Sequence, residues 1–181
     1  MIEKTFAIGI ECRNPLFPED IDYSEYDFDE ELDSVTSMFY SLSESFYLRE
    51  ILLHLKICEH DCINFGVELS ILLEDFHRFV YFANSDEEKE YTLHFYEQGA
   101  DRFLSFKKIK DGEYSLIFDD RSILGFECLS TTGTVLDLNL MLFILFSKVC
   151  FLANKMCPSI VNSPMYTAWN SDIRKIFNVQ E

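Results

Sequence analysis

Residues 91–120, YTLHFYEQGADRFLSFKKIKDGEYSLIFDD, decide the fold class of this 181-residue chain. Apolar and polar residues alternate along much of this stretch, at the period of half-buried strands. Two turn signals, at 98–101 and 110–113, interrupt the alternation, and the second contains Asp-Gly, a strong short hairpin signal. The stretch therefore predicts three strands of an antiparallel meander, and we expect residues 123–129 to add a fourth.

In the segments on the N-terminal side of the meander, the spacing of apolar residues changes from one segment to the next. Residues 5–13 alternate as a half-buried strand does. From about residue 30 the spacing becomes helical, with Asp27 or Asp29 as the expected N-cap. A second helix is expected over 46–58 and a third over 62–84. The apolar face of the first helix holds Leu32, Val35, Phe39, Leu42 and Phe46.

The C-terminal side of the meander predicts more helix. We expect a turn at 131–134, in which Thr134 caps a helix over 135–156. That helix is apolar on most faces, which indicates a buried central helix. Pro158 ends it, and a final short helix is predicted over 164–177, with Trp169, Ile173 and Phe177 facing inward.

These elements predict an α+β protein, an antiparallel meander sheet packed against several helices. At 181 residues, 48 % of them apolar, the chain is long and apolar enough for one sizeable core, so we expect a single domain over 1–181. It divides into an acidic tract at 19–33, a helical region at 30–84, the meander at 91–129 and C-terminal helices at 135–177. The 18 Phe and nine Tyr predict an aromatic core.

Charge gives the first functional indication. The chain holds 32 acids and 15 bases, a net charge of −17, and the acidic tract EDIDYSEYDFDEELD at 19–33 holds nine of the acids and no base. Nucleic acids and anionic membranes repel such a protein, whereas basic proteins attract it. A solvated acidic connection explains the tract equally well. The residues predicted to bind a partner are Asp20, Asp22, Tyr23, Glu25, Tyr26, Asp27, Asp29 and Glu30, with Glu97 and Asp101 as a second surface.

The sequence also indicates a location. Residues 1–13 do not have the composition of a secretory signal, and the longest uninterrupted apolar run, 140–146, is shorter than a membrane span. We therefore expect a soluble, cytoplasmic protein with its six cysteines reduced.

Catalytic and metal signals are weak. His54, Cys58, His60 and Cys62 offer four zinc ligands within nine residues, but their spacing is poor and no second Cys-x-x-Cys pair exists, so buried thiols and surface imidazoles are the preferred interpretation. Glu74, Asp75 and His77 resemble an acid–base cluster and equally an ordinary helix surface. The six glycines form no phosphate-binding loop. We therefore expect no catalytic residue, no metal and no cofactor.

One resemblance gives the charge a function. The segment HFYEQGADR at 94–102, followed by the strand at 103–106, a Gly turn and another strand, resembles the meander of certain small bacterial immunity proteins. Those proteins neutralise the toxins of polymorphic and contact-dependent growth-inhibition (CDI) systems. The helix at 135–156 is similar to the helix that closes such domains, so the resemblance covers 91–156. It implies a non-enzymatic toxin inhibitor that binds a basic toxin domain, above all a nuclease, one to one and occludes its active site.

Two other functions remain open at this point. A DNA-mimicking inhibitor of a nucleic-acid-binding enzyme would use the same carboxylates. A small zinc-binding protein would use His54, Cys58, His60 and Cys62. The first predicts binding to several unrelated DNA-binding proteins, and the second predicts bound zinc.

Overall fold

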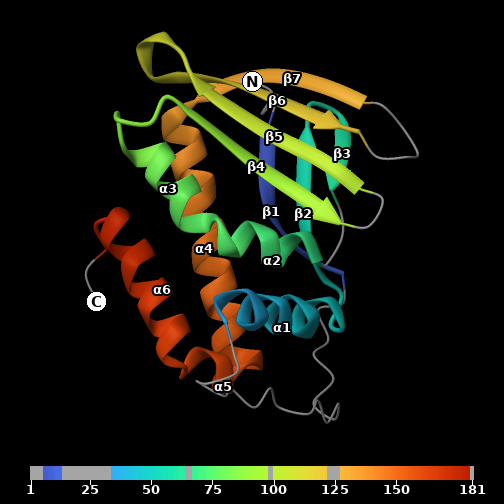
Figure 1. The fold of residues 1–181 in the computed structure, drawn as a ribbon, viewed down its shortest axis with the longest axis vertical. Helices are drawn as coiled ribbons and strands as arrows, with labels where there is room; N and C mark the ends of the chain where they lie inside the picture. Colours follow the sequence, from blue (N-terminus) through green and yellow to red (C-terminus); the bar gives the residue numbers. More distant parts are fainter. Residues whose placement is uncertain (1–5, 14–33, 64–66, 98–99, 122–126, 180–181) are drawn as a thin grey trace.

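The computed structural model describes residues 6–13, 34–63, 67–97, 100–121 and 127–179. The predicted meander is present as a four-stranded antiparallel sheet in the order β4-β5-β6-β7, called sheet B (Figure 1). Its strands are β4 (Glu90–Glu97), β5 (Ala100–Lys108), β6 (Glu113–Asp120) and β7 (Glu127–Thr134). The Asp-Gly turn is a short 3₁₀ turn at Lys110–Gly112, where Gly112 has a φ of 75° that favours glycine. The three predicted strands and the fourth are confirmed.

The fourth strand differs from the prediction at its end. β7 continues through the expected turn at 131–134, because Thr131 and Gly133 pair with Leu116 and Tyr114 of β6. Threonines favour strands, and the glycine gives the Tyr114 ring the space it needs. Thr134 caps the following helix as predicted, because its side chain accepts a hydrogen bond from the backbone N–H of Asp137.

We expect Gly133→Ala to lower the free energy of unfolding by about 1–3 kcal/mol, because overpacking strains a filled site. A Cβ at position 133 would lie 2.6 Å from the hydroxyl oxygen of Tyr114 and 2.8 Å from its Cζ. Tyr114 is buried and cannot swing away. Gly9→Ala is the control, since nothing lies within 4 Å of the Cβ it would add. Urea unfolding of both variants measures the difference, and equal stabilities would contradict this packing.

A second antiparallel sheet, sheet A, has the order β1-β2-β3. Its strands are β1 (Phe6–Cys12), β2 (Ile51–Ile57) and β3 (His60–Ile63). The predicted strand at 5–13 is confirmed, but the helix expected over 46–58 is wrong. The residues of β2 alternate into the core at period two and pair with β1 along its whole length. That ladder joins residues 39 to 51 positions apart, and this tertiary pairing overrides the local helical spacing.

The helices before the meander are α1 (Val35–Tyr47), α2 (Val67–Glu74) and α3 (Phe76–Asn84). α1 begins later than expected, and its N-cap is Ser34, which forms a capping box with Ser37. It is therefore not capped by Asp27 or Asp29, which like Leu32 lie outside the described residues. The helix predicted over 62–84 is correct from Val67 onward, but Cys62 belongs to β3 and Asp75 separates two helices.

The C-terminal helices are α4 (Val135–Met156), α5 (Pro158–Val161) and α6 (Pro164–Ile176). The bounds of α4 agree with the prediction, and the final helix is confirmed. The expectation of a buried α4 is only partly correct, because several of its apolar side chains are exposed. By length and composition α4 could cross a membrane, with a mean hydropathy of 2.0 over its most apolar window. Core helices of soluble proteins meet the same criterion, so this is weak evidence, and solubility stays a prediction.

The core lies between sheet B, sheet A and the helices. Aromatic rings from the inner face of sheet B pack against α3 and β1, with Phe106 of β5 at their centre. Its ring centroid lies 4.9 to 6.3 Å from those of Phe6, Phe79, Phe82, Tyr91 and Tyr114. The chain is thus an α+β fold with the aromatic core predicted from its composition.

Candidate functional site

The outer face of sheet B is the best candidate for an interaction surface. In Figure 1 sheet B lies at the top of the molecule, with the helices below it. Along β4, the alternation buries Tyr91, Leu93 and Phe95 and leaves the residues between them exposed. A surface of this kind normally carries small polar or charged residues, but here it also carries aromatic rings.

Four of these side chains form a continuous row, called here the sheet-B stack: Tyr96, His94, Phe103 and Arg121. The His94 ring lies 5.6 Å from the Tyr96 ring and stacks on Phe103 with centroids 4.2 Å apart and planes 12° apart. On the other side of Phe103, the guanidinium carbon of Arg121 lies 4.9 Å from the ring centroid.

Strand register brings the row together. His94 is the cross-strand partner of Phe103, and Phe103 is the partner of Asp119, so their side chains share one face. Tyr96 is likewise opposite Asp101. The stack therefore follows from the register of β4 with β5 and from the place of Arg121 directly after β6.

Two carboxylates border the stack. His94 Nε2 lies 2.6 Å from Asp101 Oδ1, and Arg121 Nη2 lies 2.6 Å from Asp119 Oδ2. The hydrogen bond and charge of Asp119 raise the pKa of Arg121, so this guanidinium is cationic at any physiological pH. Tyr96 is 60 % exposed, so its ring is available for contact with a partner. Exposed Tyr and Arg beside carboxylates are typical of residues that dominate protein–protein binding.

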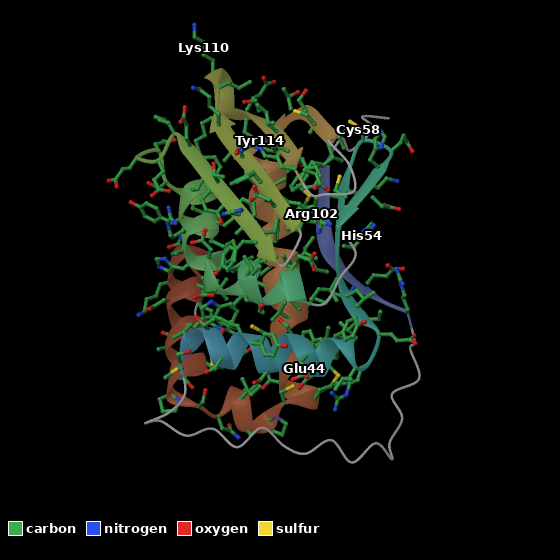
Figure 2. All side chains as sticks on the ribbon, turned by 45° about the vertical axis from the view of Figure 1, so that its right-hand side comes forward. Glu44, His54, Cys58, Arg102, Lys110 and Tyr114 are labelled. Carbon is green, nitrogen blue, oxygen red and sulfur yellow. The ribbon has the colours of Figure 1, made fainter. Side chains whose placement is uncertain are left out.

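A buried ion cluster holds the same strand end from the inside. Arg102, between Asp101 and Phe103, points inward and binds two carboxylates (labelled near the centre of Figure 2). Its Nη1 lies 3.0 Å from Glu68 Oε1 of α2, and its Nε lies 3.1 Å from Asp120 Oδ2 of β6. The side chain of Glu68 is only 1 % exposed. The cluster joins α2 to sheet B beneath the stack.

Of the residues predicted to bind a partner, only Glu97 and Asp101 lie within the described ranges. Asp101 lies at the border of the sheet-B stack, and Glu97 ends β4, although its side chain is outside what the structure describes. The tract residues lie outside the described ranges: Asp20, Asp22, Tyr23, Glu25, Tyr26, Asp27, Asp29 and Glu30. Sequence reasoning missed the stack itself. Its signal was present, since His94, Tyr96 and Phe103 occupy the outward positions of the meander.

The four potential zinc ligands lie on the β2–β3 hairpin. Figure 2 shows His54 and Cys58 at different heights along it. His54 Nε2 lies 3.0 Å from Asp61 Oδ1, and the Cys62 thiol donates to the His60 carbonyl at 3.5 Å. Within the described ranges, no three His, Cys, Asp or Glu residues are grouped so that they could hold a metal ion. The zinc hypothesis therefore has no geometric support.

Two carboxylates of the predicted acid–base cluster make contacts between secondary-structure elements. Glu74 accepts a hydrogen bond from the Thr36 hydroxyl at 2.6 Å and so joins α2 to α1. Asp75 accepts one from the Tyr91 hydroxyl at 2.9 Å and binds Arg78 at 3.3 Å. Burial raises the pKa of Tyr91, so this hydroxyl stays protonated and donates. These carboxylates are therefore engaged in holding the helices and sheet B together.

Comparison with protein-family models, curated proteins and solved structures finds no match to this chain. The function is therefore inferred from the charge of the sequence and the chemistry of the exposed surface.

Proposed function

We propose that this protein is an immunity protein of the polymorphic or CDI type. It binds a basic toxin domain one to one in the cytoplasm and covers the active site of that toxin without catalysis or a cofactor. The observation that carries the proposal is the net charge of −17. Nine of the 32 acidic residues lie at 19–33. Nuclease toxins need basic clefts to hold phosphates, and a carboxylate-rich tract with aromatic anchors complements such a cleft.

The sheet-B stack supports this proposal as a second contact. Binding energy concentrates in a few Tyr, Trp and Arg residues surrounded by weaker polar contacts. Tyr96 and Arg121 have that composition, and Asp101 and Asp119 add negative charge beside them. The carboxylates of the tract steer the basic partner, and the stack supplies packed contacts that slow its release.

The first experiment identifies the partner. The protein is used to capture proteins from its source lysate at low and then moderate salt, and the bound proteins are identified by mass spectrometry. One basic partner, bound one to one and encoded beside this chain, is the expected result. Several unrelated DNA-binding proteins would instead support the DNA mimic. Many basic proteins that all elute as salt rises would contradict both proposals.

Neutralising the tract is expected to slow association with that partner about tenfold or more and to flatten its salt dependence. The variant replaces Asp22, Asp27 and Asp29 with Asn and Glu25 with Gln. Surface plasmon resonance measures both rate constants over a salt series. The matched control neutralises four exposed acids elsewhere: Glu44, Glu50, Glu59 and Asp86. An equal effect of the two variants would show that only total charge matters, and an unchanged rate would remove the tract from the interface.

A further inference from the structure

The solvent-facing side of α4 carries an apolar stripe, which is a separate surface from the sheet-B stack. Its members are each between 37 % and 78 % exposed, and they are Leu136, Leu140, Phe143, Ile144 and Phe151. Each of the other described helices exposes fewer large apolar side chains. Isolated exposed apolar residues are ordinary, but a contiguous group indicates a binding surface.

The stripe is narrow and straight. Leu136, Leu140 and Ile144 are four residues apart and Phe151 follows seven later, so all four lie on one face of the helix. From Leu136 to Phe151 the stripe is about 22 Å long at 1.5 Å per residue. Phe143 lies at one edge of the stripe and packs on Phe177, with ring centroids 5.3 Å apart. The small exposed residue Ser147 lies within the same face, where it leaves room for another helix to approach.

Two opposite charges mark one edge of the stripe. Asp137 and Lys155 are 18 residues apart, which is five turns of an α-helix, so they project in the same direction from opposite ends. The Lys155 ammonium lies 4.8 Å from the centroid of the Phe151 ring. Asp137 accepts a hydrogen bond from the Thr134 hydroxyl at 2.8 Å. Both charges are thus placed beside the apolar residues.

This arrangement is self-complementary. In an antiparallel pair of α4 helices, the two-fold axis is perpendicular to both helices. It places each edge of one helix beside the same edge of the other. Asp137 of each copy then lies beside Lys155 of the other. With the axis near the middle of the helix, Leu140 meets Phe151 and Ile144 meets Ser147.

We propose that α4 pairs with α4 of a second copy in an antiparallel, two-fold symmetric dimer. The interface buries the stripe and forms two Asp137–Lys155 ion pairs. The charge of −17 on each copy opposes association, but salt screens that repulsion over about 8 Å and leaves the apolar contact intact. Dimerisation therefore strengthens as salt rises, whereas binding to a basic partner weakens.

Light scattering after size exclusion tests the stripe, with the wild type measured at low salt and at about 0.5 M salt. The expected mass is twice 21.3 kDa for the wild type and 21.3 kDa for Leu140→Glu. Tyr47→Glu is the control, because Tyr47 is an equally exposed apolar residue of α1 and its replacement leaves the dimer intact. Circular dichroism of each variant verifies that the fold is unchanged.

A charge exchange tests the orientation. In a dimer of either single variant, Asp137→Lys or Lys155→Glu, residues 137 and 155 carry like charges at both contacts. Each variant alone is therefore expected to have a dimer Kd raised about tenfold or more. An equimolar mixture of the two variants restores opposite charges at both positions and forms mixed dimers. A parallel dimer would not show the loss in the single variants, since the axis would then bring opposite edges of the stripe together and Asp137 would not lie beside Lys155.

Three results would overturn the proposal. The first is a wild-type mass of one chain at concentrations up to about 1 mM. The second is a dimer that Leu140→Glu leaves intact, and the third is the absence of recovery in the mixture. Wild-type protein that stays monomeric but floats with phosphatidylcholine vesicles would assign the stripe to a membrane surface instead.

Discussion

Replacing Phe106 with alanine is expected to lower the free energy of unfolding by about 3–5 kcal/mol, the usual cost of removing a buried aromatic ring. Phe106 is 1 % exposed, and its ring packs among five other aromatic rings from β1, α3, β4 and β6. Its removal leaves a cavity between sheet B and the helices that those elements cannot fill without moving. Urea unfolding followed by circular dichroism measures the change.

Phe103→Ala is the matched control, because it makes the same replacement three residues earlier on the other face of β5. Phe103 is only partly buried, so we expect a loss of about 1 kcal/mol or less. Its removal is instead expected to raise the Kd for the partner, since it takes the central ring out of the sheet-B stack. Equal losses of stability in the two variants would contradict the assignment of inner and outer faces.

Arg102→Met is expected to lower the free energy of unfolding by about 3–5 kcal/mol, the cost of removing one partner from a buried ion pair. The variant keeps much of the side-chain volume but leaves the carboxylate of Glu68, 1 % exposed, without its guanidinium. Asp120 loses the same partner at 3.1 Å. Chemical denaturation at neutral pH measures this loss.

Two further variants test whether the loss of stability comes from leaving a charge unpaired in the protein interior. Arg121→Met also removes an arginine bound to a carboxylate of sheet B, but its side chain is 52 % exposed, so we expect a loss below about 1 kcal/mol. The double variant Arg102→Met, Glu68→Met removes both charges and is expected to recover much of the loss, since an apolar pair can replace a buried ion pair. A double variant no more stable than Arg102→Met would show that the unpaired carboxylate of Glu68 is not the source of the loss.

The candidate surfaces differ in how far the sequence predicted them. The acidic tract is visible in the order of residues 19–33, because charge composition needs no fold to be recognised. The sheet-B stack was missed, although the strands carrying it were predicted, because its members come from β4, β5 and the end of β6. Only the register places His94 opposite Phe103, and only the folded chain brings Arg121 over that ring.

The helical region before the meander also contains a segment that its local sequence did not predict correctly. Residues 46–58 have a helical face when they are considered alone, and the structure makes most of them a strand. β2 gains a complete ladder with β1, a partner that a local window does not contain. In the same way, composition predicted that α4 is apolar on most faces, but which of those faces stays exposed depends on where α3, α6 and β1 pack.

The sequence by itself determined the α+β class, the meander, the bounds of α4 and the acidic character of the protein. These features are local, since strand alternation, Asp-Gly turns, apolar helices and charge runs each depend on neighbouring residues. Only the tertiary structure decided that residues 51–57 form a strand, that Arg102 holds two carboxylates beneath sheet B, and that the stack and the α4 stripe remain exposed. Each of these depends on contacts between residues far apart in the chain, and their free energy appears only when the chain has folded.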